Sequence, residues 1–473
     1  MNASYDIVVI GAGSAGLTGA RFAARLGARV ALVERARVGG DCTWTGCVPS
    51  KSLIRAAAVA EEVRTAGAYG IDAPPPLADM RRVRGHVAGA IRSVYEAERP
   101  DALEAEGIDV VLGPARFTDP RTLLVGGRAL TARRFVVCTG ARAVVPPIPG
   151  LSESPYVTHE SVFDVERLPE HLLVIGAGPI GLELAQAYRR LGADVTVMAA
   201  DLLPREEADV RTFVDDRLAR DGVRVRLGRV ESVSTRSGAI TVRGQAGEAT
   251  GDMLLVAVGR RPDVEELGLA AAGVAHSAQG VTVDRYLRTS AAHVYAAGDA
   301  LGGPQFTHLA GWQGFQAVRN ALLPGRAVGL PRVLPRVTFL DPEVATAGES
   351  EAAARARLGE RLRVHRIDMS ASDRAVAEGR TEGFIKVVTD HRGRILGAAI
   401  VADRAGEMIG ELVLAIERDL RLSDVAAVVH AYPTWSSAVQ QLAAKEAVDG
   451  FLAGRVGRLA LRLVRLRGPR ASP

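Results

Sequence analysis

DIVVIGAGSAG, residues 6–16, is the stretch that decides the fold. Residues 6–10, with the apolar run Ile7 to Ile10, predict a short buried strand, and the glycine-rich turn after it opens an alanine-rich helical segment. Gly11 permits a tight turn, Gly13 lets the backbone approach a pyrophosphate, and Gly16 lets the helix pack closely on the strand. The positive end of that helix would face the phosphates. The order of strand, turn and helix therefore predicts a dinucleotide site.

The next predicted strand, residues 29–33, ends at Glu34. A carboxylate at this point can accept hydrogen bonds from both hydroxyls of an adenosine ribose and disfavours a 2′-phosphate. A glycine turn followed by an ordinary surface glutamate is the alternative, but the complete βαβ pattern favours the nucleotide site.

The same pattern recurs further along the chain. LLVI (172–175) is followed by GAGPIG (176–181), a helical segment and a strand at 195–197. Two such fingerprints predict two dinucleotides, and an enzyme that holds both ordinarily carries hydride from a dissociable nicotinamide to a resident flavin.

The second copy of the fingerprint does not decide between NADH and NADPH. Its ribose-reading position falls at Ala199 or Ala200, where neither an NAD-selecting acid nor an NADP-selecting arginine stands. Arg205 is close enough in sequence to meet a 2′-phosphate, and a solvated surface arginine is the equal alternative. The choice between NADH and NADPH stays open at this point.

Two of the three cysteines, Cys42 and Cys47, fall in one short loop, GGDCTWTGCVPSK (39–51). Structural disulfides are rare in reducing compartments, so this pair predicts a redox function. A structural disulfide is the alternative. Cys138 is expected to be a small buried residue rather than a third redox centre.

Length and composition exclude several classes of protein. With 473 residues and 48% hydrophobic content, the chain is long enough for about three domains and is not disordered. A net charge of only +5, despite a pI near 9.3, argues against a nucleic-acid partner. The N-terminus lacks a positive segment before its short apolar run, so a cytoplasmic protein is expected.

Four more motifs complete a pattern: CTG (138–140), VGRRPD (258–263), VYAAGD (294–299) and PRVTFLDP (335–342). With the fingerprints and the cysteine loop, the chain resembles the class I pyridine nucleotide-disulfide oxidoreductases, which include glutathione reductase, dihydrolipoamide dehydrogenase and mercuric reductase. The resemblance is closest to mercuric reductase-like members without a C-terminal cysteine pair, and it covers nearly the whole chain.

The resemblance implies an α/β fold with two Rossmann-like domains and a C-terminal α+β dimerisation domain. The FAD-binding domain would comprise residues 1–150 and 280–333, and the NAD(P)-binding domain residues 151–279. The dimerisation domain would comprise residues 334–473, with a basic tail from about 454. A homodimer is expected, with the Tyr432 segment of one subunit opposite Cys42 of the other.

FAD and NAD(P)H are the implied cofactors, and no metal site is expected. The cofactor-binding residues that the motifs carry over are Gly11, Gly13, Ser14, Ala15, Gly16, Glu34, Arg35, Gly40, Asp41, Cys42, Lys51, Thr139, Gly140, Gly176, Gly178, Pro179, Ile180, Gly181, Ala199, Arg205, Gly259, Arg260, Gly298 and Asp299.

The resemblance also implies catalytic roles. Cys47 would lie against the flavin and Cys42 would face the substrate, while Lys51 would pair with Glu183 beside the flavin N5. A lysine there stabilises the negative charge of a reduced flavin. The alternative for Lys51 and Glu183 is plain helix-surface charge.

The pattern breaks near the C-terminus. Disulfide reductases of this family use a histidine, oriented by a glutamate, to protonate the leaving thiol; here Tyr432 and Ser437 take those places. A phenol with a pKa near 10 is a poor acid–base group at neutral pH. His430 lies two residues earlier, on the same side of an extended segment, and is a candidate substitute; a structural histidine is the alternative.

Two more departures narrow the mechanism. The sequence has no cysteine after Cys138, which excludes delivery of a substrate by tail thiols. Pro179 stands where glutathione reductase-like enzymes carry a tyrosine that gates the nicotinamide pocket.

These observations predict an enzyme that passes electrons from NAD(P)H through FAD and the Cys42–Cys47 pair to a metal ion, a quinone-like compound or another electrophile. The alternative is a low-molecular-weight disulfide or dihydrolipoamide oxidoreductase in which His430 or water supplies the proton. A scaffold with secondary redox turnover fits less well, because the redox residues are intact.

The last stretch carries arginines at helical spacing, Arg455, Arg458, Arg462 and Arg465, beside a stripe of leucines at 459, 463 and 466. A basic amphipathic helix can lie on an anionic membrane surface, so weak membrane contact is one expectation. A helix packed in the dimer, or a frayed tail, is the alternative.

Overall fold

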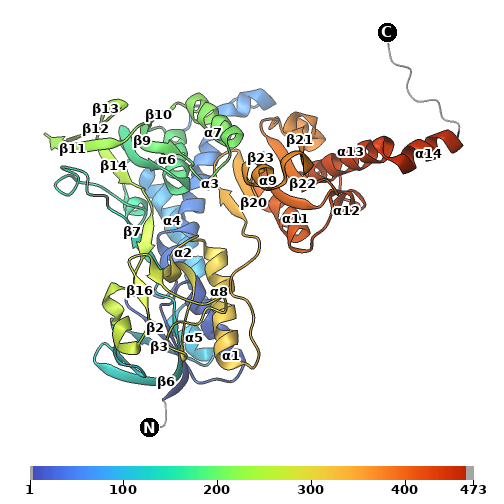
Figure 1. Ribbon diagram of the computed structural model, residues 1–473. Helices are drawn as coiled ribbons and strands as arrows, with labels where there is room; N and C mark the ends of the chain where they lie inside the picture. The colour runs from blue at the N-terminus through green and yellow to red at the C-terminus, as the bar shows by residue number, and fades with distance from the viewer. Residues whose placement is uncertain (1–3, 465–473) are drawn as a thin grey trace. The chain divides into compact units, whose positions relative to one another are not determined.

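The computed structural model describes residues 4–464 and separates into two compact units (Figure 1). The first unit runs to Pro204 and resumes over Arg217–Pro331, and the second comprises Arg205–Asp216 and the chain from Arg332 onward. Helix α7 (Ala208–Arg220) therefore crosses a unit boundary. Within the described residues no helix combines the length and apolar character that crossing a bilayer requires.

A seven-stranded sheet, with strands from both ends of the first unit, carries the first fingerprint. Its strand order is β3-β2-β1-β6-β5-β4, and β18 also pairs with β6. The pairs among β3, β2, β1, β6 and β18 are parallel, and β5 and β4 continue the sheet antiparallel. The strands are β1 (Tyr5–Ile10), β2 (Val30–Glu34), β3 (Ile108–Leu112), β4 (Ala115–Asp119), β5 (Thr122–Val125), β6 (Arg128–Val137) and β18 (Val294–Ala296).

Strand β1 is central, and this explains its sequence. Ile7, Val8 and Val9 are fully buried, because a parallel strand with both faces covered needs a continuous apolar run. Helices α1 (Ser14–Arg25) and α8 (Thr307–Leu322) pack against each other, with the rings of Phe22 and Phe315 4.4 Å apart. The further helices are α2 (Gly40–Trp44), α3 (Cys47–Thr65), η1 (Ala66–Tyr69), α4 (Met80–Tyr95), α5 (Pro100–Ala105) and η5 (Gly298–Leu301).

A second parallel sheet, in the order β10-β9-β8-β14, carries the second fingerprint. A three-stranded antiparallel sheet, β11-β12-β13, follows it in the chain. The elements are β8 (His171–Ala177), α6 (Pro179–Leu191), β9 (Asp194–Leu202), β10 (Val223–Leu227), β11 (Val230–Arg236), β12 (Ala239–Gly244), β13 (Gly247–Gly251) and β14 (Met253–Val256).

Two short strand pairs and three single-turn helices complete the first unit. They are β7 (Ala141–Ala143) with β15 (Arg260–Pro262), β16 (His276–Ser277) with β17 (Gly280–Val281), and η2 (Val162–Asp164), η3 (Glu265–Leu267) and η4 (Leu269–Ala272).

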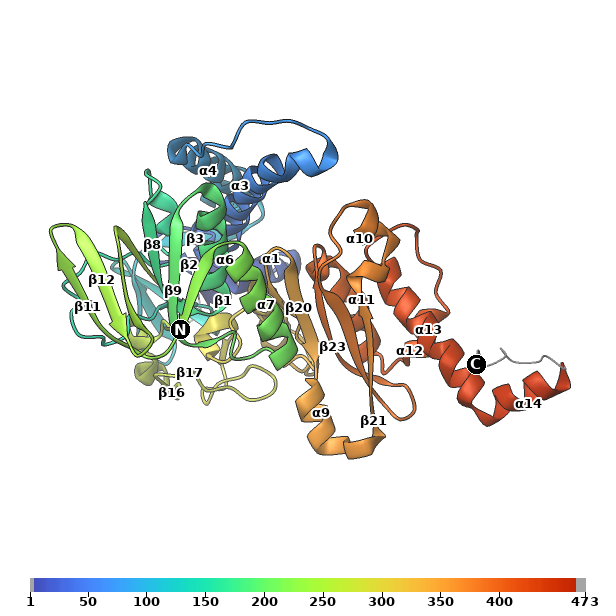
Figure 2. The same ribbon diagram turned by 90° about the horizontal axis from the view of Figure 1, so that it is seen from above.

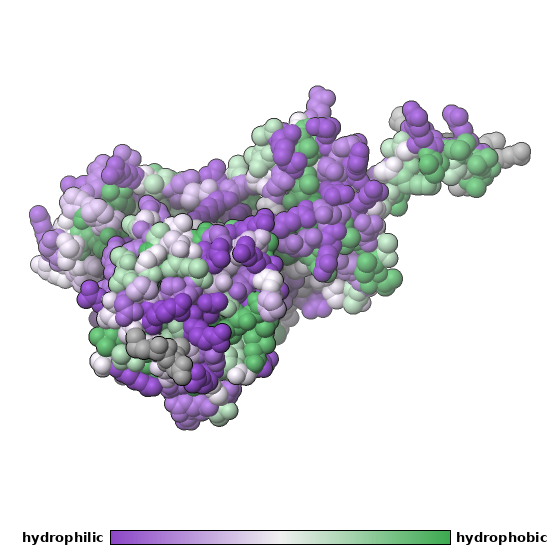
Figure 3. Space-filling model, turned by 60° about the horizontal axis from the view of Figure 1, so that its bottom comes forward, coloured by the Kyte–Doolittle hydropathy of each residue, from purple (hydrophilic) through white to green (hydrophobic). Residues whose placement is uncertain are grey.

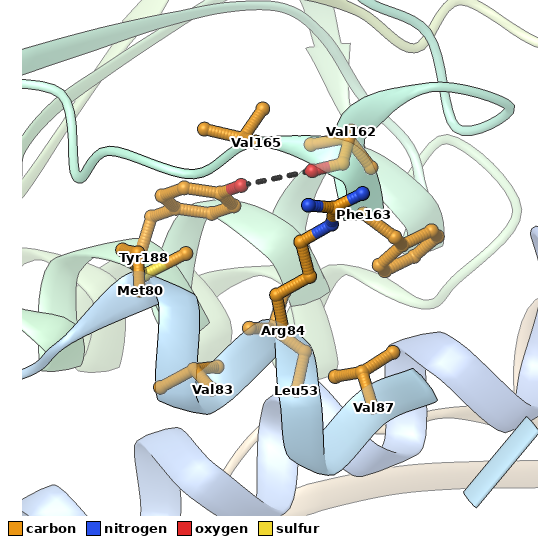
Figure 4. A pocket seen from close by; sticks show the side chains of 9 residues that line it. All are labelled: Leu53, Met80, Val83, Arg84, Val87, Val162, Phe163, Val165 and Tyr188. Carbon is orange, nitrogen blue, oxygen red and sulfur yellow. Dashed lines mark hydrogen bonds between the residues drawn. The ribbon is translucent and has the colours of Figure 1, made fainter. Parts of the chain in front are cut away.

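A narrow apolar hollow lies among α3, α4, η2 and α6 (Figure 4). Leu53, Val87 and Phe163 line it, and the Tyr188 hydroxyl donates to the carbonyl of Val162 at 3.2 Å. Its volume of about 10 Å³ has room for one water molecule at most. The hollow is therefore a packing gap and not a substrate site.

The second unit is built on a five-stranded antiparallel sheet in the order β19-β20-β23-β22-β21. Its strands are β19 (Arg336–Thr338), β20 (Glu343–Gly348), β21 (Leu362–Asp368), β22 (Phe384–Asp390) and β23 (Ile395–Ala402). Its helices are α9 (Glu351–Leu358), η6 (Gly359–Arg361), η7 (Met369–Ala371), α10 (Asp373–Ala377), α11 (Ala405–Glu417), α12 (Leu422–Ala426), α13 (Ser437–Ala453) and α14 (Arg455–Leu463).

Alternation along the strands divides this sheet into two faces. Ile385 and Ile400 share a core with Leu412 of α11 and Leu442 of α13, whereas Val388 packs with α9 residues on the other face. Figure 2 shows α11 and α13 along one side of the sheet. The sheet is thus covered on both faces.

The fold expectations are confirmed at their main points. The strands expected at residues 6–10, 29–33, 172–175 and 195–197 are present, each in a parallel sheet. A helix follows Gly454 as expected, ending at Leu463; Arg465, Leu466 and Arg467 of the expected helix lie outside the described residues. The expected boundaries of the FAD, NAD(P) and dimerisation domains stay a prediction.

The contact between α1 and the first glycine turn gives a stability prediction. A Cβ at Gly16 would lie 1.8 Å from the carbonyl oxygen of Gly11, so a methyl group must push α1 off the turn. We expect Gly16→Ala to lower the free energy of unfolding by about 1–3 kcal/mol, measured by chemical denaturation.

The matched control is Gly85→Ala in the exposed middle of α4, where a Cβ meets no atom within 4 Å. This change should leave stability unchanged or raise it by up to about 1 kcal/mol. Equal effects of the two substitutions would contradict the packing argument.

Candidate active site

Cys42 and Cys47 are brought together by a tight turn between two helices. Cys42 lies in α2, and Cys47 is the first residue of α3. A Cβ at Gly46 would lie 2.8 Å from the carbonyl oxygen of Asp41, so only glycine allows the chain to turn this closely. Both cysteines are free thiols and are half-buried.

The two thiols are unequal. Cys42 donates a hydrogen bond to Cys47, which raises the pKa of the Cys42 thiol and lowers that of Cys47 below the usual thiol range. Burial opposes the lowering at Cys47, but the Thr307 hydroxyl, 3.1 Å from its sulfur, and the Lys51 charge support it. Cys47 is therefore the thiolate of the pair, and Cys42 carries the proton.

The Lys51 ammonium is held in place by a buried carboxylate. Its Nζ lies 2.8 Å from Oε2 of Glu183, whose side chain is only 7% exposed. Lys51 lies one turn after Cys47 on α3, and Glu183 comes from α6. The predicted pairing of these two residues is present in the structure, although neither residue's catalytic role is tested by it.

The glycine cradle of the first fingerprint is tightly built. A Cβ at Gly40 would fall 2.7 Å from the Cα of Gly13, so two glycine backbones pass each other here. Glu34 ends β2, and its two oxygens accept from the amides of Ala12 at 2.9 Å and Ala36 at 2.8 Å. Each oxygen keeps a further lone pair, which can accept from a ribose hydroxyl.

Arg260 joins the cysteine loop to a buried acid. Its guanidinium lies 3.1 Å from Asp299 and 3.6 Å from Asp41, and it donates to the carbonyl of Gln305. Burial raises the pKa of Asp299, while the Arg260 charge opposes the rise. Arg35, also expected at the cofactor, pairs with Asp263 at 3.0 Å.

Two buried polar atoms make no hydrogen bond to any described residue. Thr139 Oγ1 has no hydrogen-bond partner among the described residues, and neither has Nε2 of the buried His159, 3.9 Å from Asp41. Buried hydroxyls and imidazoles are normally satisfied, so both atoms fit a site meant to hold a polar ligand. With the glycine cradle and Glu34, this donor and acceptor set fits a flavin dinucleotide.

Two contacts at the site could not be predicted. Thr307 lies 260 positions from Cys47 in the chain, and nothing in its surroundings marks it. His159 carries no motif either. The Ser14 hydroxyl, expected only at the cofactor, also hydrogen-bonds the Cys42 thiol and works to lower its pKa.

The second fingerprint has the same construction. A Cβ at Gly181 would lie 2.2 Å from the carbonyl oxygen of Gly176, and Pro179 and Ile180 open α6 after Gly178. The carbonyl of Ala199, in β9, accepts from Gly228 at 2.8 Å. The expected contact residues Gly140, Gly259 and Gly298 all have positive φ, which glycine tolerates. Arg205 belongs to the second unit.

Cys138 is set apart from the pair. It is 5% exposed, and burial raises the pKa of its thiol to about 12. A protonated, buried thiol is unreactive, as expected from the sequence.

In the second unit, both nitrogens of His430 are engaged. Nε2 lies 2.9 Å from Glu411, and Nδ1 lies 3.0 Å from the carbonyl of Val428. Burial works against the charged ring, but these hydrogen bonds outweigh it and raise the pKa of His430. The contact with Glu411 orients the ring, and both ring nitrogens are occupied by groups of the same unit.

Tyr432 is 72% exposed, and its hydroxyl donates to the carboxylate of Asp373. That hydrogen bond raises the pKa of the Tyr432 phenol further above 10. The Ser437 hydroxyl is turned to the carbonyl of Thr434 at 2.6 Å. This segment therefore offers no oriented acid–base group among its described residues other than the paired His430.

Two nucleotide cradles beside a vicinal thiol pair define a pyridine nucleotide-dependent redox enzyme. The family model described as pyridine nucleotide-disulphide oxidoreductase matches residues 5–314, and the model of that family's dimerisation domain matches residues 334–443. The chain belongs to the class I pyridine nucleotide-disulfide oxidoreductases.

Similar proteins span the chain. A mercuric reductase of Shigella flexneri is 37% identical over 447 residues, covering 91% of this chain and 79% of the relative. A dihydrolipoyl dehydrogenase of Thermus scotoductus is 34% identical over 453 residues, covering 93% of this chain and 97% of the relative.

Solved structures agree. The HOCl-induced flavoprotein disulfide reductase RclA of Escherichia coli superposes with a TM-score of 0.85 at 29% identity, covering 93% of this chain and 99% of RclA. RclA has also been solved as a Cu(II) complex. The chain is thus an FAD-dependent, NAD(P)H-using oxidoreductase with a dimerisation domain that supports a homodimer.

The Lys51 charge gives a pH prediction. Because the pKa of Cys47 is depressed, its thiolate exists at neutral pH and is lost only as the pH falls through that low value. Lys51→Met removes one cause of the depression, so the thiolate should be lost at a higher pH. The measurement is a pH titration of the thiolate-to-flavin absorbance in the reduced holoenzyme.

Lys445→Met, an exposed position of α13, is the control and should leave that titration unchanged. If the Lys51 and Lys445 variants titrate like the unchanged enzyme, the Lys51 charge does not set the thiolate.

Proposed function

We propose that the enzyme uses NAD(P)H to reduce, through FAD and the Cys42–Cys47 pair, an acceptor that needs no proton, with a redox-active or thiophilic metal ion as the first choice. Quinone-like compounds meet the same condition when two of them take one electron each and leave as semiquinone anions, and other electrophiles that accept electrons without a proton belong to the same class. The observation that carries the proposal is a preformed Cys47 thiolate in a chain whose Tyr432 replaces the expected proton donor.

Proton accounting favours such an acceptor. Oxidation of the Cys42 thiol and the Cys47 thiolate to a disulfide releases two electrons and a single proton. One divalent ion reduced to the metal takes both electrons, or two divalent ions take one each, and neither acceptor takes up a proton. A disulfide acceptor, by contrast, must gain two protons to become two thiols, and Tyr432 is a weak donor.

Each residue of the site has a separate role in the proposed reaction. Bound FAD supplies two-electron transfer between the nicotinamide and the cysteine pair. Glu183 fixes Lys51, Lys51 and Thr307 stabilise the Cys47 thiolate, and Cys42 presents the exchangeable thiol. We assign the cofactor to the glycine cradle of residues 11–16 and 40, with Glu34, Thr139 and Asp299 as its polar partners.

Similar proteins also support a metal ion as the acceptor. Mercuric reductases are among the curated proteins most similar to this chain, and RclA has been solved with Cu(II). Residues 139–473 contain no cysteine, so the proposal assigns the metal ion to Cys42 and Cys47 alone.

A second candidate is a low-molecular-weight disulfide or dihydrolipoamide oxidoreductase. One observation favours it: His430 and Glu411 form an imidazole–carboxylate pair, the arrangement that orients a general acid. In that case His430, or water, would protonate the leaving thiol.

The dithiol mechanism predicts the outcome of an anaerobic titration with NADH and NADPH. Two-electron reduction should produce a long-wavelength thiolate-to-flavin band. Cys42→Ser should leave the flavin reducible but lower acceptor turnover on the order of a thousandfold or more. Cys138→Ser is the control and should keep both properties. Absence of the band in the unchanged enzyme would refute the mechanism.

The acceptor class is tested by a screen with Hg²⁺, Cu²⁺, a quinone, lipoamide and glutathione disulfide. We expect turnover with a metal ion or the quinone and slow turnover with the disulfides. Tyr432→His should raise disulfide turnover by about tenfold or more, because it restores a proton donor, whereas Tyr432→Phe should not. Fast disulfide turnover by the unchanged enzyme, lost in His430→Gln, would favour the second candidate instead.

A further inference from the structure

The C-terminal end of the second unit exposes an unusual amount of apolar surface. This surface, the C-terminal arm, comprises residues 448–464 at the end of α13 and in α14. Seven of its apolar side chains are between 42% and 75% exposed: Val448, Phe451, Leu452, Val456, Leu459, Leu463 and Val464. In Figure 3, hydrophobic residues gather along one side of the helical end at the upper right, and hydrophilic residues stand on the other.

Positively charged side chains lie next to the apolar side of α14. Arg455, Arg458 and Arg462 recur at intervals of three and four residues, so they share one side of α14 next to the stripe of Leu459 and Leu463. Residues 454–473 contain six arginines and no acidic residue. The arm is thus amphipathic, and the sequence from residue 454 onward is strongly cationic.

A defined, hydrogen-bonded turn connects α13 to α14. A Cβ at Gly457 would lie 1.9 Å from the carbonyl oxygen of Phe451, so glycine lets α14 turn tightly against the end of α13. Arg458 donates to the carbonyl of Ala453 at 2.6 Å, and Gly454 closes the turn with hydrogen bonds to Gly450 and Phe451. The apolar stripe and the arginines therefore keep a fixed relation to each other.

The family's dimerisation domain matches residues 334–443 and ends before this surface begins. The exposed apolar side chains at 448–464 therefore lie outside the segment that matches the dimerisation domain.

We propose that the C-terminal arm docks the enzyme on an anionic lipid surface. Leucines and valines along one side of a helix enter the boundary between headgroups and acyl chains, while flanking arginines bind lipid phosphates. No described helix can cross a bilayer, so the arm would lie on the membrane and not through it. The proposal goes beyond the redox function and does not depend on the identity of the acceptor.

The test is flotation of the full-length, FAD-loaded enzyme with phosphatidylcholine vesicles, with and without phosphatidylglycerol. We expect binding only to the anionic vesicles, and it should weaken with added salt. Leu459→Asp with Leu463→Asp should abolish it. Replacing Arg455, Arg458 and Arg462 by Gln should weaken it by roughly fivefold per charge removed.

The matched control is Leu77→Asp, which changes a leucine that is 97% exposed elsewhere in the chain and should float like the unchanged enzyme. NAD(P)H oxidation by all variants should be unaltered, because none touches the cysteine pair. Equal flotation of the unchanged enzyme and the Leu459/Leu463 variant would overturn the proposal. So would conversion of that variant from dimer to monomer in gel filtration, which would assign the arm to contact between subunits.

Discussion

The ion pair between Lys51 and Glu183 is the interaction on which the rest of the site depends. It joins the helix that begins with Cys47 to the helix that follows the second glycine turn, so one contact ties the cysteine loop to the second fingerprint. A buried carboxylate without such a partner would be costly, and the lysine is therefore held where its charge acts on the sulfur. Thr307 and Cys42 add hydrogen bonds to the same sulfur, and three different segments converge on one atom.

In the proposed mechanism, this arrangement separates the supply of electrons from the supply of protons. The groups around Cys47 stabilise negative charge and keep a proton on Cys42, but the segment expected to return protons to a substrate has Tyr432 bonded to Asp373 and His430 bonded to Glu411. Acceptors therefore fall into two classes, those that must take up protons together with the electrons and those that take up electrons alone. The proposed preference for metal ions and electrophiles follows from that division rather than from the shape of a pocket.

Much of this could be predicted from the sequence, because the decisive signals are local. A strand, a glycine turn and a helix follow one another within a few residues, and the cysteine loop lies within thirteen. What could not be predicted depends on distant contacts: Thr307 beside Cys47, Glu411 beside His430, and the buried His159 near Asp41. The grouping of residues 205–216 with the C-terminal unit is of the same kind, since packing and not sequence order decides it.

The burial of Cys138 makes the number of thiols that react with a reagent depend on both the redox state and the folding of the protein. The chain has three sulfhydryl groups, of which one is sealed in the core and two share the reactive turn. An alkylating reagent would therefore label none in the native oxidised enzyme, two in the native reduced enzyme and three in the reduced, unfolded chain. A single mass measurement would thus read the redox state and the integrity of the fold together.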